Sequence, residues 1–259
     1  MDAGHSHIEI DFKLVSGIIL VPAAVNDEQG YLAFDTGAMQ TALHQKHFPG
    51  LQGKTLEIAK FNDGVKSDTA TETTIRSLTF AGVTIIDHPA MLMDLSYVED
   101  SLAAFEPGLC LLGTMGIDII RDFSVLLDYG QQKIILNPAC GLERSTRIPL
   151  RMEALPVVDA DIDGESHRFV LDTGANTCLL DAALQGRLPV QPMEGAPNVV
   201  QLAAISLRER SYHNVVSVFG DLTAIQKKVP VDGVIGYAVL SPQRSYLDFA
   251  NQALYLEEA

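Results

Sequence analysis

Short apolar runs, separated by Gly, Asn, Asp and Pro, make up most of the chain. Runs such as 73–80, 199–207 and 215–219 are rich in β-branched residues and are bounded by turn-forming residues, as strands are. Stretches with a helical pattern are few and short, at residues 41–47, 117–123 and 179–185. The pattern therefore predicts an all-β fold class, mainly strands with a few short helices.

The pattern occurs twice along the chain. Residues 25–38 and 162–175 align without gaps, and each passes from a polar turn through a short apolar strand into Asp-Thr-Gly-Ala. A second matched block begins at Gly116 and at Gly236, and in both halves a Leu-Asp pair follows with its aspartate twelve residues after the glycine. Matched blocks at matched spacings indicate two homologous units in one chain.

The two units meet near residues 137–141, whose sequence Asn-Pro-Ala-Cys-Gly contains the Pro and Gly of a connecting segment. We therefore expect an N-terminal lobe at residues 1–145 and a C-terminal lobe at residues 146–259.

Composition and charge exclude several classes of protein. The formal net charge is −15 and Lys and Arg form no cluster, whereas nucleic-acid binding needs a basic surface. The longest apolar runs, such as 18–25, are far shorter than the roughly 20 residues of a membrane helix. Three cysteines without a C-x-x-C pair indicate neither a zinc ribbon nor a disulfide scaffold.

The N-terminus lacks the charged-then-apolar layout of a signal peptide, yet a strand-like segment follows residues 1–6 almost directly. A periplasmic or secreted location after removal of a leader and a cytoplasmic location both stay open.

Each Asp-Thr-Gly places a carboxylate on a tight turn after an apolar strand, and Gly37 and Gly174 permit a close backbone approach there. If the fold brings the two turns together, Asp35 and Asp172 cannot both ionise and must share a proton. One carboxyl can then activate a water while the other protonates a substrate carbonyl oxygen. The pair titrates as a unit, so the two roles are not assigned to separate residues.

Two copies of apolar-apolar-Asp-Thr-Gly, each followed downstream by an apolar-apolar-Gly such as Val234-Ile235-Gly236, resemble the pepsin-like and retropepsin-like aspartic peptidases. The four-residue form Asp-Thr-Gly-Ala and the small lobes are more similar to retropepsins and their bacterial relatives. The resemblance implies two homologous acid-protease-like lobes with the active-site cleft between them, and Asp35 and Asp172 as the catalytic residues. It implies a peptide or protein substrate, and neither a cofactor nor a metal.

The same resemblance implies roles for the rest of each loop. Thr36 and Thr173 would bond across to the opposite loop, since a hydroxyl at the interface can lock two loops together. The remaining loop-support residues are Gly37, Ala38, Gly174 and Ala175. For the apolar-apolar-Gly of the first lobe the repeat register selects Gly116, although Leu111-Leu112-Gly113 has the better apolar pair.

Peptidases of this type close a β-hairpin flap over the substrate. Residues 56–66 alternate in character and contain an Asn-Asp-Gly turn, which predicts a flap with its tip at Phe61, Asn62, Asp63 and Gly64. The spacing from the motif aspartate to the downstream glycine is 81 residues in the first lobe and 64 in the second. We therefore expect no counterpart of this hairpin in the second lobe.

Other polar residues have simpler interpretations. His44 and His47 are three apart and could face one metal ion, but no third ligand at metal-site spacing accompanies them, which favours a surface helix. Asp128 and Asp248 suit strands that lead into hairpin turns. Residues 159–164 resemble a calcium loop faintly but lack its later glutamate, so they are interpreted as a hairpin.

Three functions are compatible with the sequence. The favoured one is an aspartic endopeptidase, a monomer with both catalytic aspartates in one chain. The second is a catalytically degenerate peptide-binding relative, against which the presence of both aspartates and both glycines argues. The third is a scaffold whose lobes pair with those of another chain, although a short connection favours pairing within the chain.

Overall fold

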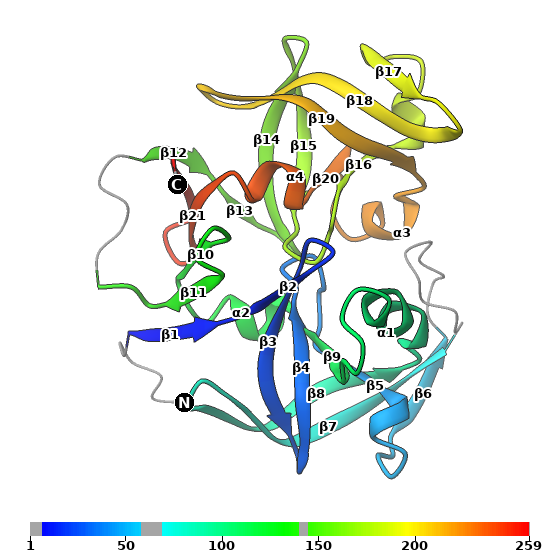
Figure 1. The fold of residues 1–259 in the computed structure, drawn as a ribbon, viewed down its shortest axis with the longest axis vertical. Helices are drawn as coiled ribbons and strands as arrows, with labels where there is room; N and C mark the ends of the chain where they lie inside the picture. The colour runs from blue at the N-terminus through cyan, green and yellow to red at the C-terminus, as the bar shows by residue number, and fades with distance from the viewer. Residues whose placement is uncertain (1–6, 58–68, 140–144, 259) are drawn as a thin grey trace.

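A computed structural model describes residues 7–57, 69–139 and 145–258. Figure 1 shows two β-rich lobes stacked along the long axis of the molecule, with the N-terminal half below and the C-terminal half above. Within these residues, strands form two eight-stranded sheets and one six-stranded sheet. The prediction of a mainly β protein with two homologous lobes is confirmed.

The first eight-stranded sheet has the order β2-β3-β4-β9-β5-β8-β7-β6. Its strands are β2 (Lys13–Val15), β3 (Ile18–Val25), β4 (Glu28–Phe34), β5 (Ala42–His44), β6 (Lys54–Glu57), β7 (Thr69–Phe80), β8 (Val83–Met93) and β9 (Leu111–Met115). The pairs β4–β9 and β5–β8 are parallel and the other pairs are antiparallel.

The second eight-stranded sheet repeats this order strand for strand, as β13-β14-β15-β20-β16-β19-β18-β17. Its strands are β13 (Arg151–Met152), β14 (Pro156–Ile162), β15 (Glu165–Leu171), β16 (Cys178–Asp181), β17 (Val190–Met193), β18 (Ala196–Leu207), β19 (Arg210–Gly220) and β20 (Gly233–Ile235). The internal repeat of the sequence is therefore a repeat of a complete sheet topology.

The six-stranded sheet joins the lobes, and it lies at the left of Figure 1 between them. Its order is β1-β11-β10-β21-β22-β12, with three strands from each half of the chain. The strands are β1 (Ile8–Asp11), β10 (Val125–Asp128), β11 (Lys133–Leu136), β12 (Thr146–Pro149), β21 (Gln243–Asp248) and β22 (Ala253–Glu258). The halves meet where β10 pairs with β21, Val125 opposite Leu247.

Helices are short, as expected, but two of the three predicted positions are wrong. The helices are α1 (Ser96–Ala103), α2 (Ile117–Ile120), α3 (Thr223–Gln226) and α4 (Tyr237–Leu240), with 3₁₀ turns η1 (Gln45–His47) and η2 (Ala182–Leu184). Residues 41–47 and 179–185 are each a strand that ends in a 3₁₀ turn, because pairing with a neighbouring strand overrides local helical character. Among the described helices none is long and apolar enough to cross a membrane.

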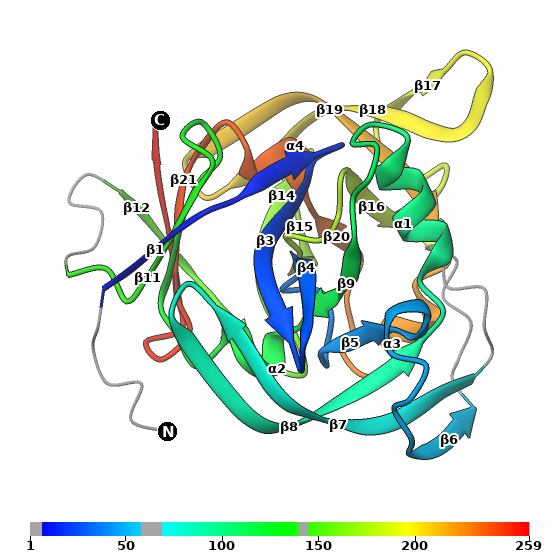
Figure 2. The same cartoon turned by 60° about the horizontal axis from the view of Figure 1, so that its bottom comes forward.

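One connected cluster of buried apolar side chains runs through both lobes. It includes Phe34 and Ile119 from the first half and Leu171 and Leu240 from the second. Figure 2 shows the molecule turned so that the N-terminal lobe comes forward, with β7 and β8 at the bottom of the picture. The lobes are therefore packed as one body.

The expectation that the second lobe lacks an outer hairpin is wrong. β17 and β18 pair antiparallel in the sheet positions of β6 and β7, with Met193 opposite Ala196 across the turn Glu194-Gly195. The shorter spacing in the second lobe therefore reflects shorter connections, not a missing hairpin. In the first lobe Glu57 pairs with Thr69, and the predicted flap tip, Phe61 to Gly64, lies outside the described residues.

The minor turn predictions are confirmed. Residues 159–164 belong to the β14–β15 hairpin, where Asp163 and Gly164 take positive φ angles of 53° and 81°. The Asp128 carboxylate accepts the Gln131 N–H at 2.9 Å, and that of Asp248 accepts the Asn251 N–H at 3.0 Å. Both aspartates therefore shape turns.

Candidate active site

Both Asp-Thr-Gly segments begin where a central strand of a sheet ends. The N–H of Asp35 donates to the Met115 carbonyl at 3.0 Å, and the N–H of Asp172 donates to the Ile235 carbonyl at 2.9 Å. The glycine after Met115 is Gly116, so the repeat register, and not the better apolar pair, identifies the first-lobe counterpart of Gly236.

The two threonines lock the loops together with four hydrogen bonds. Each hydroxyl accepts the other threonine's backbone N–H at 3.0 Å. The Thr36 hydroxyl donates to the Leu171 carbonyl at 2.7 Å, and the Thr173 hydroxyl donates to the Phe34 carbonyl at 2.6 Å. Both side chains are buried, so removal of one hydroxyl would leave buried N–H and C=O groups unpaired.

The two carboxylates lie directly against the opposite loop. A Cβ atom added at Gly37 would lie 2.2 Å from Asp172 Cγ, and one added at Gly174 would lie 2.3 Å from Asp35 Cγ. Asp35 Oδ1 accepts the N–H groups of Gly37 and Ala38 at 2.8 and 2.9 Å, and Asp172 Oδ1 accepts that of Gly174 at 2.7 Å. The carbonyl of Ala38 accepts the N–H of Ile117 at the start of α2, and the carbonyl of Ala175 accepts the N–H of Tyr237 at the start of α4.

The electrostatics of the pair favour a shared proton. Burial raises the pKa of Asp35 well above its usual range, and the charge of Asp172 and a hydrogen bond with its carboxyl act in the same direction. The N–H groups of Gly37 and Ala38 lower the pKa of Asp35 but do not outweigh these effects. A carboxyl and a carboxylate in contact offer a proton donor and a proton acceptor in one place.

His44 and His47 do not lie on a surface helix, contrary to the expectation. His44 is fully buried at the end of β5, and His47 follows in η1. Both face Glu99 of α1, a third possible ligand that spacing did not reveal. His47 Nε2 lies 2.9 Å from Glu99 Oε1, and His44 Nε2 lies 3.7 Å from Glu99 Oε2.

The hydrogen bonds of this cluster favour a structural anchor over a metal site. The Lys46 ammonium pairs with Glu99 Oε2, so a cation already neutralises the carboxylate. The Leu95 N–H donates to His44 Nδ1 at 3.1 Å, which leaves the proton of the neutral ring on Nε2, the atom that would face a metal. The Leu111 N–H also donates to Glu99, at 3.2 Å. Glu99 therefore ties α1 to η1 and β9.

Tyr129 is a group near the carboxyl pair that the sequence did not single out. Its side chain is buried, and its hydroxyl has no hydrogen-bond partner among the described atoms. Burial and then the charge of Asp172 raise the pKa of this hydroxyl well above its usual range, so it stays protonated. Phe249 holds the matching place in the repeat, so alignment of the halves could have revealed the extra hydroxyl.

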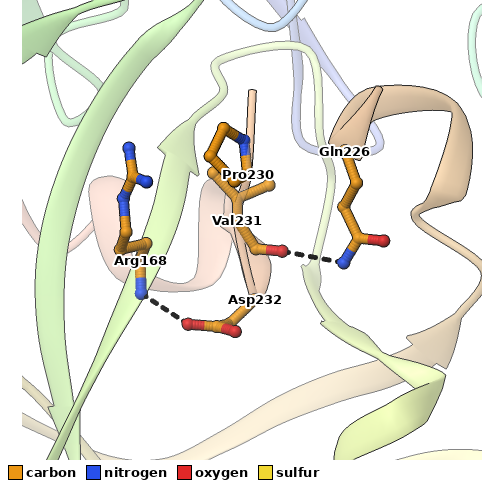
Figure 3. A pocket seen from close by; sticks show the side chains of 5 residues that line it. All are labelled: Arg168, Gln226, Pro230, Val231 and Asp232. Atoms are coloured by element: carbon orange, nitrogen blue, oxygen red, sulfur yellow. Dashed lines mark hydrogen bonds between the residues drawn. The ribbon is translucent and has the colours of Figure 1, made fainter. Parts of the chain in front are cut away.

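A separate hollow of about 340 Å³ lies in the second lobe, lined by Arg168, Gln226, Pro230, Val231 and Asp232. Figure 3 shows that its polar groups bond to one another: the Arg168 N–H donates to Asp232 and the Gln226 amide donates to the Val231 carbonyl, both at 2.9 Å. Neither motif aspartate lines it.

Comparison with known proteins gives a match in structure but not in sequence. No family model matches the chain, and no curated protein matches its sequence. Among solved structures, the aspartic proteinase from Irpex lacteus matches with a TM-score of 0.61 over 98% of each chain, at 12% sequence identity. The chain therefore has the two-lobed fold of an aspartic proteinase.

Proposed function

We propose that this chain is an aspartic endopeptidase, in which Asp35 and Asp172 share a proton and activate a water against a peptide bond. The observation that carries the proposal is the contact of each carboxylate with the opposite loop's glycine, so close that a Cβ would lie 2.2 or 2.3 Å away. The raised pKa of Asp35 supports it, because a shared proton has to persist at the pH of the reaction.

The chemistry follows from the pair. A water between the carboxyls gives a proton to the carboxylate as its oxygen bonds to the substrate carbonyl carbon, while the other carboxyl gives its proton to the carbonyl oxygen. In the second step the carboxyl that took the water proton gives it to the amine nitrogen as the carbon–nitrogen bond breaks. The other carboxylate takes a proton from a hydroxyl of the intermediate as the carbonyl re-forms, which restores the starting pair. The hydrogen bonds of Thr36 and Thr173 hold the two loops in place for both steps.

We further propose that the chain is retropepsin-like within this class. Both motifs read Asp-Thr-Gly-Ala, and each lobe carries an antiparallel pair of outer strands, β6–β7 and β17–β18, in the same position of its sheet. Two lobes with one topology resemble a fused pair of single-lobe enzymes. By this proposal the lobes span residues 1–145 and 146–259.

The test is cleavage of a mixed peptide library across pH, with and without a statine-type inhibitor. Wild-type protein should cleave peptides in mildly acidic solution and the inhibitor should block cleavage. Asp35→Asn and Asp172→Asn should each abolish cleavage, because either change removes a carboxyl that must exchange a proton. Cleavage by either variant at the wild-type rate would contradict the assignment of Asp35 and Asp172 as the catalytic pair.

Thermal stability of Asp35→Asn is the control for folding. A raised carboxyl pKa means that the folded protein holds this proton more tightly than the unfolded chain, so stability falls as pH rises through the folded pKa. The variant removes that loss and should melt at the wild-type temperature or above at pH 7. If the wild type and Asp35→Asn both bind the peptides and neither cleaves them, the degenerate peptide-binding alternative is favoured.

A further inference from the structure

A polar cluster of Thr41, Asp118 and His88 lies at the end of the first catalytic loop, which runs from Asp35 to Thr41. Asp118 Oδ1 accepts the Thr41 N–H and the Thr41 hydroxyl, both at 2.9 Å. Asp118 Oδ2 lies 3.0 Å from His88 Nε2. Thr41 is fully buried, and the side chains of His88 and Asp118 are only 15% and 20% exposed.

This cluster completes a series of ties between the catalytic loop and the β9–α2 junction. The loop is bound at its start by Asp35 N–H to the Met115 carbonyl, and in its middle by Ile117 N–H to the Ala38 carbonyl at 2.8 Å. At its end the Gly116 N–H donates to the Thr41 hydroxyl at 3.2 Å, and Asp118 holds Thr41 from the other side.

The second lobe repeats the first two ties but has no carboxylate that supports the third. The N–H of Asp172 donates to Ile235, and that of Tyr237 donates to Ala175. Where the first lobe has Thr41, Asp118 and His88, the second has Cys178, Ala238 and Val215.

Backbone conformation and hydrogen bonding both support the structural equivalence of these residues in the two lobes. Asp87 and Asn214, which precede His88 and Val215, both take a left-handed backbone, with φ of 53° and 55°. The Gly236 N–H faces the Cys178 thiol as Gly116 faces the Thr41 hydroxyl.

The two catalytic loops are therefore held by different kinds of interaction. Hydrogen bonds to a carboxylate are directional and are among the stronger ones in proteins, so they fix the end of the first loop in one place. In the second lobe the Gly236 N–H bonds to the Cys178 thiol, a weaker acceptor, and the methyl group of Ala238 offers no hydrogen bond in place of the Asp118 carboxylate.

From this asymmetry we propose that Asp118, oriented by His88, is a positioning residue that fixes Asp35 through Thr41, while the Asp172 loop needs no such residue. The inference rests on the proposed peptidase function. Asp118 touches neither the reacting atoms nor Asp35 itself, and it acts through the loop that carries Asp35.

Asp118 keeps its charge where the pair would work. Burial raises the pKa of its carboxyl, but hydrogen bonds from His88 and Thr41 outweigh burial and leave the pKa below its usual range. In mildly acidic solution, where one carboxyl of the catalytic pair is protonated, Asp118 is ionised and accepts all of its bonds. The polar tie therefore persists through the working range of the pair.

The residues at the equivalent positions of the second lobe define a matched variant for the test. Thr41→Cys, Asp118→Ala and His88→Val together give the first lobe the residues that already pack in the second lobe. We expect this triple variant to fold with a near wild-type melting temperature and to lose about 10- to 100-fold in kcat, with KM within about threefold of wild type. Its affinity for a statine-type inhibitor should fall with kcat, since both depend on the arrangement of the carboxyl pair.

Three further variants, Asp118→Asn, Asp118→Ala and Asp122→Asn, separate positioning from folding. Asp118→Asn keeps an oxygen for the Thr41 N–H and hydroxyl and should recover most of the activity that Asp118→Ala loses. Asp122→Asn, an exposed aspartate just beyond α2, makes the same change in charge and should leave kcat unchanged.

The outcomes are distinct. An active wild type with a triple variant of equal kcat and inhibitor affinity would overturn the positioning role and leave the peptidase proposal intact. If the triple variant unfolds, Asp118→Asn against Asp118→Ala decides, and equal kcat in these two overturns the role. An inactive wild type is the failure of the proposed function itself.

Discussion

Single residues in the two loops carry the tightest constraints of the molecule. Gly37 and Gly174 are required for the contact of each loop with the opposite carboxylate, not for an unusual φ angle, because neither has a positive φ. The nearest atoms belong to the carboxylates, which are themselves held by backbone N–H groups. The methyl group of an alanine would therefore displace the carboxyl pair.

We expect Gly37→Ala and Gly174→Ala each to lower kcat at least 100-fold, on the order of the effect of a 1 Å misplacement. Peptide cleavage at saturating substrate would measure the loss. Gly164→Ala is the matched control, because the space around its position is open, although its positive φ makes some loss of stability expected. Near wild-type kcat in the two loop variants would mean that the carboxyls can rearrange freely.

The pH dependence follows from the electrostatics of the same residues. The raised pKa of Asp35 keeps the shared proton in place to a higher pH than for an ordinary carboxyl, so activity should peak at about pH 5 to 6 and fade as that proton is lost. Ala38→Ser and Ala175→Ser would offer hydroxyls that stabilise the charged form and lower the pKa. The alkaline limb of the kcat profile of the double variant should therefore shift to lower pH, whereas a wild-type optimum below about pH 3 would contradict this view.

Among the elements, α1 depends on one buried carboxylate. Glu99 is 3% exposed and joins α1 to Lys46, His47 and the backbone of Leu111. Burial raises the pKa of Glu99, but the hydrogen bonds from Lys46 and His47 outweigh burial, and the folded-state pKa lies below its usual value. This stabilisation is fully present above the unfolded pKa and is lost as the pH falls through the lower folded pKa.

Glu99→Gln should therefore destabilise the protein by about 1 to 3 kcal/mol at pH 7, and the difference from wild type should shrink toward pH 3. Thermal melts of both proteins across that range give the measurement. Glu106→Gln removes the partner of Lys13 at a partly exposed pair, where solvent screens the charges, and should cost clearly less than Glu99→Gln. Equal losses in the two variants would show that the Glu99 cluster is no special anchor.

The whole molecule is held together by a sheet and an interior that neither lobe completes alone. β10 and β21 pair across the lobes, and one apolar cluster continues from one half to the other. Each lobe also contributes one aspartate to the pair. Separation of the lobes would expose apolar surface and a strand edge, so we expect them to unfold together.

Calorimetry should thus give a single unfolding transition, and light scattering should give a monomer of 28.0 kDa. Cleavage per molecule should stay constant on dilution, since both aspartates belong to one chain. Loss of specific activity on dilution, or a mass near twice this value, would instead favour lobes that pair between chains.

The sequence alone determined the features that depend on local or repeated patterns. Alternation and turn residues predicted a β protein, and the aligned Asp-Thr-Gly-Ala segments predicted two equivalent lobes with Asp35 and Asp172 at equivalent positions. The repeat register also identified Gly116 against the better apolar pair at Leu111-Leu112. Gap-free spacing carries this information because each repeat is one folding unit with its own strand order.

Only the tertiary structure decided which distant residues meet. Residues 41–47 have helical character but pair as a strand, and Glu99, 52 residues after His47, becomes its partner. Asp118 bonds to Thr41, which is 77 residues away in the sequence. The β17–β18 hairpin forms in the second lobe although the motif spacing predicted that this lobe would lack it. Such contacts depend on sheet order and packing, and no local pattern encodes the distance between two strands that the fold brings side by side.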